Sequence, residues 1–383
     1  MTTPFSSLQN QVSPDVIDLG LGDPSLSLLP LDIIQAAAQA RLSQGDNSFL
    51  QYGTEQGDGH FRLALANFLT RGYGFDLEPE NIFVTNGISN ALDLICALFT
   101  RAGDTIFVEE PTYFLALRIF ADHHLNVVSI DMDENGLVIE SLEEKLAEFQ
   151  PKFLYLIPTF QNPMGTTTPQ ERRERLVQLA KEYDFIIVAD EVYHLLSYTS
   201  HAQTQPKSFA AYTDSENVIS LGSFSKILAP GLRLGWLQAH SEKIKRFNTC
   251  GLLDSSGGLN PFTSAIIRGV IESGGLDNNI NKLINIYRAR LHVMNSALQE
   301  HLPSIEYMVP GGGYFFWLRL PEKTDARELR KSAPFFKVDF RPDTLFSSRG
   351  GLKNQIRLCF VHYEEGELRE GILRLKECLN KAL

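Results

Sequence analysis

The 383-residue sequence has few cysteines and no long apolar run. Its four cysteines, Cys96, Cys250, Cys359 and Cys378, lie far apart and form no CxxC pair, which argues against both a zinc site and a disulfide framework. Such cysteine usage favours a reducing compartment. No stretch reaches about 18 consecutive apolar residues, so we expect no membrane span. The N-terminus also lacks the basic and apolar regions of a secretory signal, and we therefore expect a cytoplasmic protein.

The sequence also has fewer positively charged than negatively charged residues. Lysine and arginine total 35 against 46 aspartates and glutamates, which gives a formal net charge of −11. Because nucleic acids require a basic face, this balance argues against a nucleic acid as the main partner. Small anionic ligands stay compatible with it, since they need only a few local cations. The nine histidines show no metal-ligand spacing, so no metal site is predicted.

Short runs of β-branched and aromatic residues alternate with helical patterns between about residues 81 and 239. The predicted strands are Ile82–Val84, Thr105–Val108, Phe153–Ile157, Phe185–Ala189 and Val218–Leu221, and the clearest helices are Asn90–Phe99 and Pro169–Tyr183. Continuous apolar strands that alternate with helices indicate an α/β fold with a mostly parallel sheet between helices. In such sheets, ligands bind at the carboxyl ends of the strands.

The pattern changes after Ser273. The sequence predicts a long helix, a glycine-rich turn, two strands and a final helix: Asn279–Leu302, Gly311–Gly313, Tyr314–Leu320, Gln355–Val361 and Glu364–Leu379. We expect a large domain at 46–273 and a smaller α+β domain at 274–383. The N-terminal segment 1–45 is expected to pack on the small domain.

The stretch from Ser220 to Trp236 carries the clearest chemical signal. Its sequence is SLGSFSK followed by ILAPGLRLGW, so that a strand ends in small and hydroxyl residues before Lys226, and Arg233 follows. Most lysines are solvated. Taken alone, this stretch fits a solvated lysine and a functional lysine about equally well. Between a buried-looking strand and an apolar run, however, a lysine loses its proton more easily and can attack a carbonyl. The serines and the arginine would suit a phosphate.

This stretch resembles the cofactor-lysine motif of the class I/II aminotransferases, which belong to the fold-type I pyridoxal-phosphate-dependent enzymes. The similarity is closest to the kynurenine/2-aminoadipate and aromatic aminotransferase branch and extends from Asp18 to Phe360, with further motifs in the expected order. It implies a fold-type I architecture with pyridoxal 5'-phosphate (PLP) as the cofactor. It also implies an aminotransferase that moves an amino group from an L-amino acid to a 2-oxo acid by a ping-pong mechanism.

The resemblance assigns five residues to the cofactor ring. Lys226 would bind the cofactor as a Schiff base and then move the substrate proton. Asp190 would pair with the pyridine nitrogen and keep it protonated. Tyr193 and Asn162 would bond the phenolic oxygen, and Tyr113 would stack on the ring. Without the resemblance, an aspartate after a strand and an Asn-Pro turn are common loop features.

A strand–glycine–helix junction offers a place for the cofactor phosphate. Amides at a helix N-terminus bind anions, although many such junctions bind nothing. The resemblance implies a phosphate cup made of Gly87, the amides of Ile88 and Ser89, and the side chains of Ser223, Ser225 and Arg233. Relatives often have a hydroxyl residue in place of Ile88, so this chain keeps only the amide there. Tyr52 resembles a tyrosine that reaches the phosphate of a neighbouring subunit, which implies a homodimer with shared active sites.

Substrate binding falls to three residues in the same comparison. Arg357 lies between apolar residues in a predicted strand, where a guanidinium is costly unless it is paired. A buried acidic partner is one explanation. The resemblance implies instead that Arg357 binds the substrate α-carboxylate, for which its planar fork is suited. Gly22 and Asn162 would line the same site.

Two other functions stay open at this point. A carbon–sulfur β-lyase or an aminocyclopropane-carboxylate-synthase-like enzyme would share the lysine, aspartate and arginine, and fold alone does not decide between them. Some bacterial transcription regulators carry an aminotransferase-like domain behind a basic winged-helix head. The acidic charge and the lack of such a head in this sequence make that function the least expected.

Overall fold

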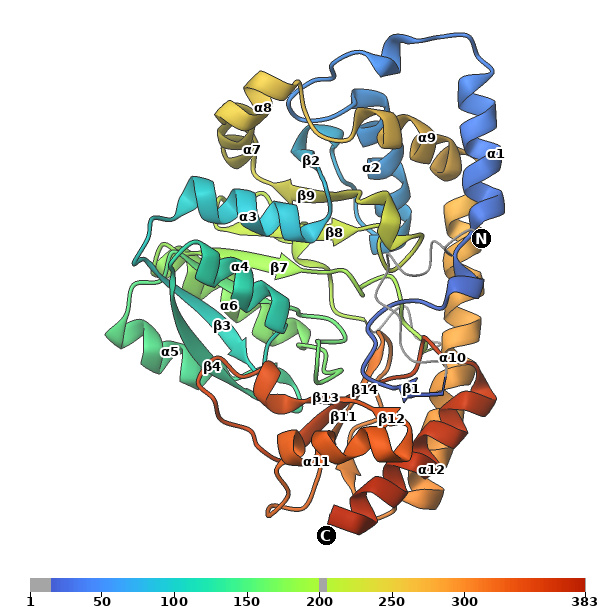
Figure 1. Cartoon of the computed structure of the whole chain (residues 1–383). Coiled ribbons are helices and arrows are strands. Elements are labelled where there is room, and N and C mark those ends of the chain that lie inside the picture. The colour runs from blue at the N-terminus through green and yellow to red at the C-terminus, as the bar shows by residue number, and fades with distance from the viewer. Residues whose placement is uncertain (1–14, 200–204, 383) are drawn as a thin grey trace.

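The computed structural model describes residues 15–199 and 205–382, arranged around one large sheet (Figure 1). The first 14 residues of the predicted segment 1–45 lie outside the described residues. None of the helices in the described ranges has the length and apolar character needed to cross a membrane.

The large sheet has eight strands in the order β2-β9-β8-β7-β6-β3-β4-β5. Their bounds are β2 Ile82–Thr85, β3 Thr105–Glu110, β4 Asn126–Asp133, β5 Gly136–Leu137, β6 Phe153–Leu156, β7 Ile186–Asp190, β8 Val218–Ser223 and β9 Gly235–Ala239. Strands β8, β7, β6, β3 and β4 pair in parallel, whereas β9 is antiparallel to both of its neighbours and β5 to β4. The predicted mostly parallel sheet is therefore confirmed, and all five predicted strands are present within a residue or two.

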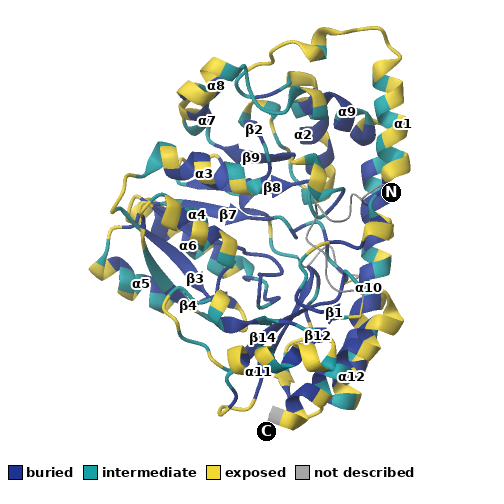
Figure 2. Cartoon of the chain, viewed as in Figure 1, coloured by how far each residue is buried: buried dark blue, intermediate teal, exposed yellow. Residues whose placement is uncertain are grey.

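Helices cover both faces of this sheet. They are α2 Gly59–Tyr73, α3 Ile88–Phe99, α4 Phe114–Asp122, α5 Ile139–Glu148, α6 Gln170–Glu182, α7 Ser241–Asn248, α8 Gly251–Ser256 and α9 Pro261–Glu272. Alternation along β6 explains the two layers. Phe153 and Tyr155 belong to the buried cluster that includes α3 and α4, and Leu154 and Leu156 to the cluster that includes α5 and α6. The strands in the middle of the sheet are accordingly buried along most of their length, whereas β4, near one edge, is largely half-buried or exposed (Figure 2).

A second, four-stranded antiparallel sheet has the order β10-β11-β14-β13. Its strands are β10 Glu306–Tyr307, β11 Phe315–Arg319, β13 Arg341–Pro342 and β14 Gln355–Cys359, and its helices are α10 Gly275–His301, α11 Ala326–Ser332 and α12 Glu365–Ala382. Helix α10 packs along α12 (Figure 1). The predicted long helix, two strands and final helix are all present.

The N-terminal segment contacts both halves of the molecule. Strand β1 (Ile17–Asp18) pairs in parallel with β12 (Val338–Asp339), beside the four-stranded sheet. Helix α1 (Leu31–Leu42) packs instead against α9, which belongs to the layer over the large sheet. The loop between β1 and α1 consequently passes from one half of the molecule to the other.

Candidate active site

A cavity of about 360 Å³ lies between the carboxyl ends of the large sheet, the four-stranded sheet and the N-terminal loop. Its wall includes side chains that follow β6, β7 and β8, as expected for a parallel sheet. Twelve residues predicted from the sequence line it: Gly22, Ile88, Ser89, Tyr113, Asn162, Asp190, Tyr193, Ser223, Ser225, Lys226, Arg233 and Arg357. Segments that are more than three hundred residues apart in sequence thus meet at one place.

Lys226 presents its amine to this cavity. The side chain is partly buried, and Nζ donates a hydrogen bond of 2.7 Å to the backbone oxygen of Gly22. The ring of Tyr314 lies 5.3 Å from Nζ. Burial lowers the pKa of Lys226, while the nearby carboxylate of Asp23 partly opposes this shift. A lysine with a lowered pKa supplies the neutral amine that attacks carbonyl groups.

Asp190 ends strand β7 as a buried carboxylate. Its Oδ2 accepts a hydrogen bond of 2.9 Å from the hydroxyl of Tyr155, and its Oδ1 accepts one of 3.3 Å from the amide of Val192. Burial raises the pKa of Asp190 to about 6, and the Tyr155 hydrogen bond works against that rise. A carboxylate in such a place suits a cationic nitrogen on a ligand.

The N-terminus of α3 lies beside hydroxyl and guanidinium donors. Gly87 caps this helix with φ at 85°, and no side chain caps it. Arg233, with φ at 45°, holds its guanidinium against this turn, because Nη2 donates to the backbone oxygen of Asn86 at 3.3 Å. The hydroxyls of Ser223 and Ser225 lie 2.9 Å apart beside it. Helix amides, hydroxyls and a guanidinium are the donors that phosphate prefers.

Arg357 is buried and has no carboxylate within 4.0 Å among the described residues. Its Nη1 donates to Oδ1 of Asn162 and its Nη2 to the backbone oxygen of Gly20, each at 2.8 Å, while Nε has no partner in the described chain. The ring of Phe315 lies 4.0 Å from its guanidinium carbon. Burial lowers the pKa of Arg357 to about 10, so it stays charged at neutral pH. A buried acidic partner therefore does not balance the charge of this guanidinium, and a ligand anion could do so.

Two predicted residues do not line the cavity. Gly87 lies beside the guanidinium of Arg233, and its φ of 85° with ψ of 172° is a backbone conformation that residues with a Cβ rarely adopt, which favours glycine there. Tyr52 is 79% exposed and lies beside Gly257, away from the cavity of its own chain.

The structure adds cavity residues that the sequence did not indicate, chiefly Asp23, Phe315 and Arg341. Arg341 is the register partner of Arg357 across β13 and β14, and it forms hydrogen bonds of 3.1 and 3.0 Å to the two oxygens of Asp18. No motif surrounds Arg341, so only strand register could have located it. Asp23 directly follows Gly22 and could have been inferred from that neighbour.

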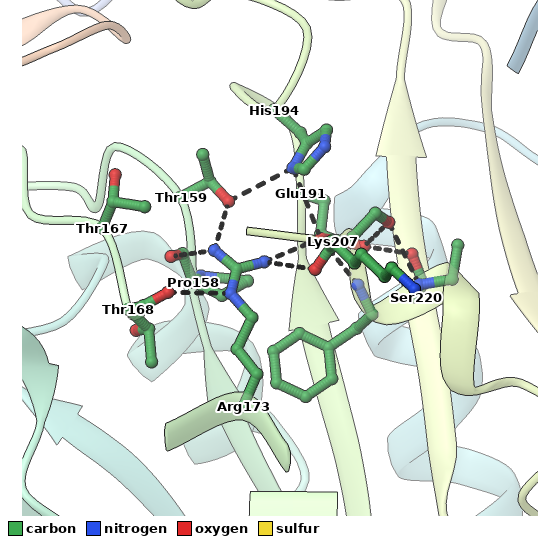
Figure 3. A network of polar contacts seen from close by, with 12 residues as sticks. Pro158, Thr159, Thr167, Thr168, Arg173, Glu191, His194, Lys207 and Ser220 are labelled. Carbon is green, nitrogen blue, oxygen red and sulfur yellow. Dashed lines mark hydrogen bonds and ion pairs between the residues drawn. The ribbon is translucent and has the colours of Figure 1, made fainter. Parts of the chain in front are cut away.

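A buried polar network joins Arg173 of α6 to Glu191, the residue that follows β7 (Figure 3). Arg173 of α6 donates to the backbone oxygens of Thr168, Lys207 and Pro158 and to Oγ1 of Thr159, at 2.8–2.9 Å. Glu191 accepts from Ser208 Oγ, Ser220 Oγ and the amide of Phe209, and its Oε1 lies 3.8 Å from Arg173 Nη1. The network ties together the segments that carry Asn162, Asp190 and the strand before Lys226.

The chain as a whole is similar to known aminotransferases. Residues 14–375 match the family described as aminotransferase class I and II. The aromatic-amino-acid aminotransferase 1 of Thermococcus litoralis is 38% identical over 377 residues, which cover 96% of this chain and 89% of that protein. Among solved structures, the multiple substrate aminotransferase of Thermococcus profundus has a TM-score of 0.90 and 36% identity, covering 100% of this chain and 96% of that one. The kynurenine aminotransferase of Pyrococcus horikoshii, solved with PMP, has a TM-score of 0.90 and 33% identity, covering 99% and 97%.

Proposed function

Because the chain belongs to the class I and II aminotransferases, we propose that the cavity at the ends of β6, β7 and β8 is its active site and that Lys226 holds the cofactor. The protein is a PLP-dependent aminotransferase, which moves an amino group from an L-amino acid to a 2-oxo acid by a ping-pong mechanism. The observation that carries the assignment of the site is the partly buried Lys226 amine, which faces the same cavity as the unpaired Arg357.

The residues present fit PLP. The uncapped N-terminus of α3 supports a phosphate held by the amides of Ile88 and Ser89 at Gly87, with Ser223, Ser225 and Arg233. The buried Asp190 carboxylate supports a ring nitrogen at that wall, with Tyr113 stacking on the ring and with Asn162 and Tyr193 at its phenolic oxygen. When bound, PLP supplies the electron sink that stabilises the substrate carbanion.

Three side chains of the cavity are proposed to bind the substrate carboxylate, move the proton and balance the charge of the ring. Arg357 binds the α-carboxylate of either substrate through the part of its fork that protein acceptors leave free, with Gly22 and Asn162 beside it. Lys226 would take the proton from the substrate Cα, because burial lowers its pKa and so favours the neutral amine that a base requires. Asp190 balances the charge of a protonated ring nitrogen.

We propose an amino donor with a large apolar or aromatic side chain. The cavity wall supports this, because it includes Leu92, Phe114, Leu115, Ile119 and Phe315. Arg341 is already neutralised by Asp18, and Asp23 repels a distal carboxylate. The Thermococcus litoralis relative is named for aromatic amino acids. Faster single-turnover reaction with L-phenylalanine than with L-aspartate is expected, and the reverse order would contradict this choice.

We propose that the enzyme is a homodimer with active sites shared across the interface. Large apolar side chains are exposed between residues 31 and 52 and on helices α8 and α9, including Leu31, Leu50, Tyr52, Leu252 and Phe262. Exposed apolar patches of this kind mark association surfaces. A second copy that covers Tyr52 would bring this side chain near the phosphate cup of its partner. Sedimentation at twice the 43.0 kDa of the chain is the expected result.

Two further proposals concern the domain division and the cellular location. We propose a division into an N-terminal segment 1–45, a large PLP-binding domain 46–273 and a small domain 274–383, supported by the two separate sheets. The contact of α1 with α9 attaches part of the segment 1–45 to the large domain. We also propose a cytoplasmic location, supported by four buried cysteines without disulfides in the described chain.

An absorbance spectrum tests the assignment of the active site. The purified enzyme with PLP is expected to show a band between about 300 and 500 nm that moves to shorter wavelength when an L-amino acid is added. Lys226→Ala is expected to lose both the lysine-linked band and turnover while it stays folded. Lys181→Ala, an exposed lysine of α6, serves as the control and should behave as wild type. Near-normal activity of Lys226→Ala would reject the assignment.

A further inference from the structure

A single hydroxyl group lies directly behind the carboxylate of Asp190. It belongs to Tyr155 of β6, whose side chain is fully buried. The hydroxyl donates to Oδ2 of Asp190 at 2.9 Å, and no other side chain in the described residues donates to that carboxylate. Tyr155 does not line the cavity, so it reaches no ligand itself.

We propose that the Tyr155 hydroxyl is a positioning group that keeps Asp190 anionic and oriented toward the cofactor ring nitrogen. The inference rests on the proposed function, in which Asp190 pairs with that nitrogen. It concerns a residue that takes part in neither binding nor proton transfer.

The geometry fixes the orientation of the carboxylate. A carboxylate has about four acceptor positions, and protein donors occupy one on each oxygen: the Tyr155 hydroxyl on Oδ2 and the Val192 amide on Oδ1. Rotation of the carboxylate would break both hydrogen bonds. The remaining positions are free for the cavity, which Asp190 lines.

The core holds the hydroxyl in place. Tyr155 and Val188 are register partners in β6 and β7, so Tyr155 lies beside the strand that ends in Asp190. Its ring packs edge-on against Phe120 of α4, with centroids 5.5 Å apart. Removing the hydroxyl alone leaves this packing unchanged, and the polar contact can therefore be tested separately from the fold.

The charged surroundings of Asp190 show why a donor is needed there. The titratable groups that influence Asp190, or that it influences, are Glu109, Tyr113, Tyr155, Glu191, Tyr193 and Lys226. Glu109 is mostly neutral at pH 7, because burial raises its pKa to about 8. Burial raises the pKa of Glu191, which the neighbouring Arg173 partly opposes, and the charge of Glu191 in turn raises the pKa of Asp190. Burial raises the pKa of Tyr155 well above its usual value, so its hydroxyl remains a donor throughout the working pH range.

The test is Tyr155→Phe in the PLP-loaded enzyme. A carboxylate that loses a donor holds its proton to higher pH, and a hydrogen bond to a charged group is worth about one pH unit or more. The acid limb of the single-turnover rate is expected to move up by about one pH unit. PLP is expected to dissociate about 10-fold faster, measured by transfer of the cofactor to an apo-acceptor.

Tyr307→Phe is the matched control. Tyr307 also donates its hydroxyl to one side-chain oxygen, Oδ1 of Asn295 at 3.1 Å, but it lies in β10, outside the cavity. Its pH limb and PLP dissociation rate should equal those of wild type. Replacement of Tyr155 by 3-fluorotyrosine, a stronger donor, is expected to move the limb to lower pH, which a purely structural role would not do.

Asp190→Asn separates the two possible failures. If Asp190→Asn is as active as wild type, the proposed role of Asp190 is wrong, and the inference falls with it. If Asp190→Asn is inactive while Tyr155→Phe keeps both the wild-type pH limb and the wild-type PLP dissociation rate, only the inference about Tyr155 is overturned.

Discussion

Removal of Arg173 is expected to destabilise the protein far more than removal of its sequence neighbour Arg172. The side chains of Arg173 and Glu191 are both 0% exposed, and Arg173 donates four hydrogen bonds besides its ion pair. Arg173→Met leaves the Glu191 carboxylate buried without a cation. Breaking a buried pair in this way costs about 3–5 kcal/mol.

The double variant shows how much of that cost belongs to the pair. Glu191→Gln alone leaves Arg173 as the unpaired buried charge and is expected to cost a similar amount. The double variant Arg173→Met with Glu191→Gln leaves no buried charge without a partner. Its loss in free energy of unfolding should therefore be smaller than the sum of the losses of the two single variants by about 2 kcal/mol. The polar donors around position 191 still find an amide oxygen there.

Urea unfolding followed by far-ultraviolet circular dichroism measures these differences, at one fixed protein and PLP concentration because both shift the apparent stability. Arg172→Met is the matched control. Arg172 lies next in sequence on α6 and pairs with Asp133 at 2.6 Å, but both side chains are partly exposed. Its loss should cost about 1 kcal/mol or less. Equal costs for the two arginine variants, or strict additivity in the double variant, would refute the reasoning.

Three further predictions follow from the site. Arg357→Ala should raise KM for amino and 2-oxo acids by about 100-fold in steady-state assays, since a charge-assisted contact to the α-carboxylate is lost; a loss of folding with unchanged KM would contradict this. Burial raises the pKa of Glu109 to about 8 from a usual value of 4.5, so the folded state binds the extra proton and stability falls as pH rises between these values. Glu109→Gln, which stays neutral, should flatten that slope in urea titrations at pH 5 and 8, and an unchanged slope would show that Glu109 is not its source. Finally, mixed refolding of inactive Lys226→Ala with a Tyr52→Ala variant should restore more activity than either alone, because one site of the hybrid has both residues; no gain would argue against shared sites.

The sequence predicted the elements whose pattern is local. The apolar runs of β3, β6, β7 and β8 are continuous because both faces of the sheet are covered, and they were found within a residue or two. Helix α1 escaped prediction because its apolar residues are divided between two faces: Ile33, Ala37 and Ala38 are partly buried against the core, whereas Leu31 and Leu42 are exposed. Strand β9 escaped because its antiparallel pairing depends on β2 and β8 rather than on its own sequence.

Around the proposed active site, the residues in local motifs were likewise predicted from the sequence, and Tyr155 and Glu109 were not. Loop residues that belong to local motifs, such as Asn162 before Pro163 and Lys226 after the hydroxyl-rich run that ends β8, were predicted. Tyr155 and Glu109 lie within strands, where a tyrosine looks like any core aromatic and a glutamate like a strand end. Their contact with the catalytic wall arises from the order of strands β3, β6 and β7 in the sheet, which spacing along one chain does not contain.

The charges of the cavity also bear on the kinetic mechanism. Its described wall carries the cations Lys226, Arg233, Arg341 and Arg357, although the whole chain has a net charge of −11. Arg341 is paired with Asp18, Arg233 lies at the phosphate end, and Lys226 is the proposed reacting amine. Arg357 is then the one cation of the described wall left for a substrate α-carboxylate. Because the amino acid and the 2-oxo acid each bring such a group, they must use Arg357 in turn, so an excess of either is expected to compete with the other for the site, as a ping-pong mechanism requires.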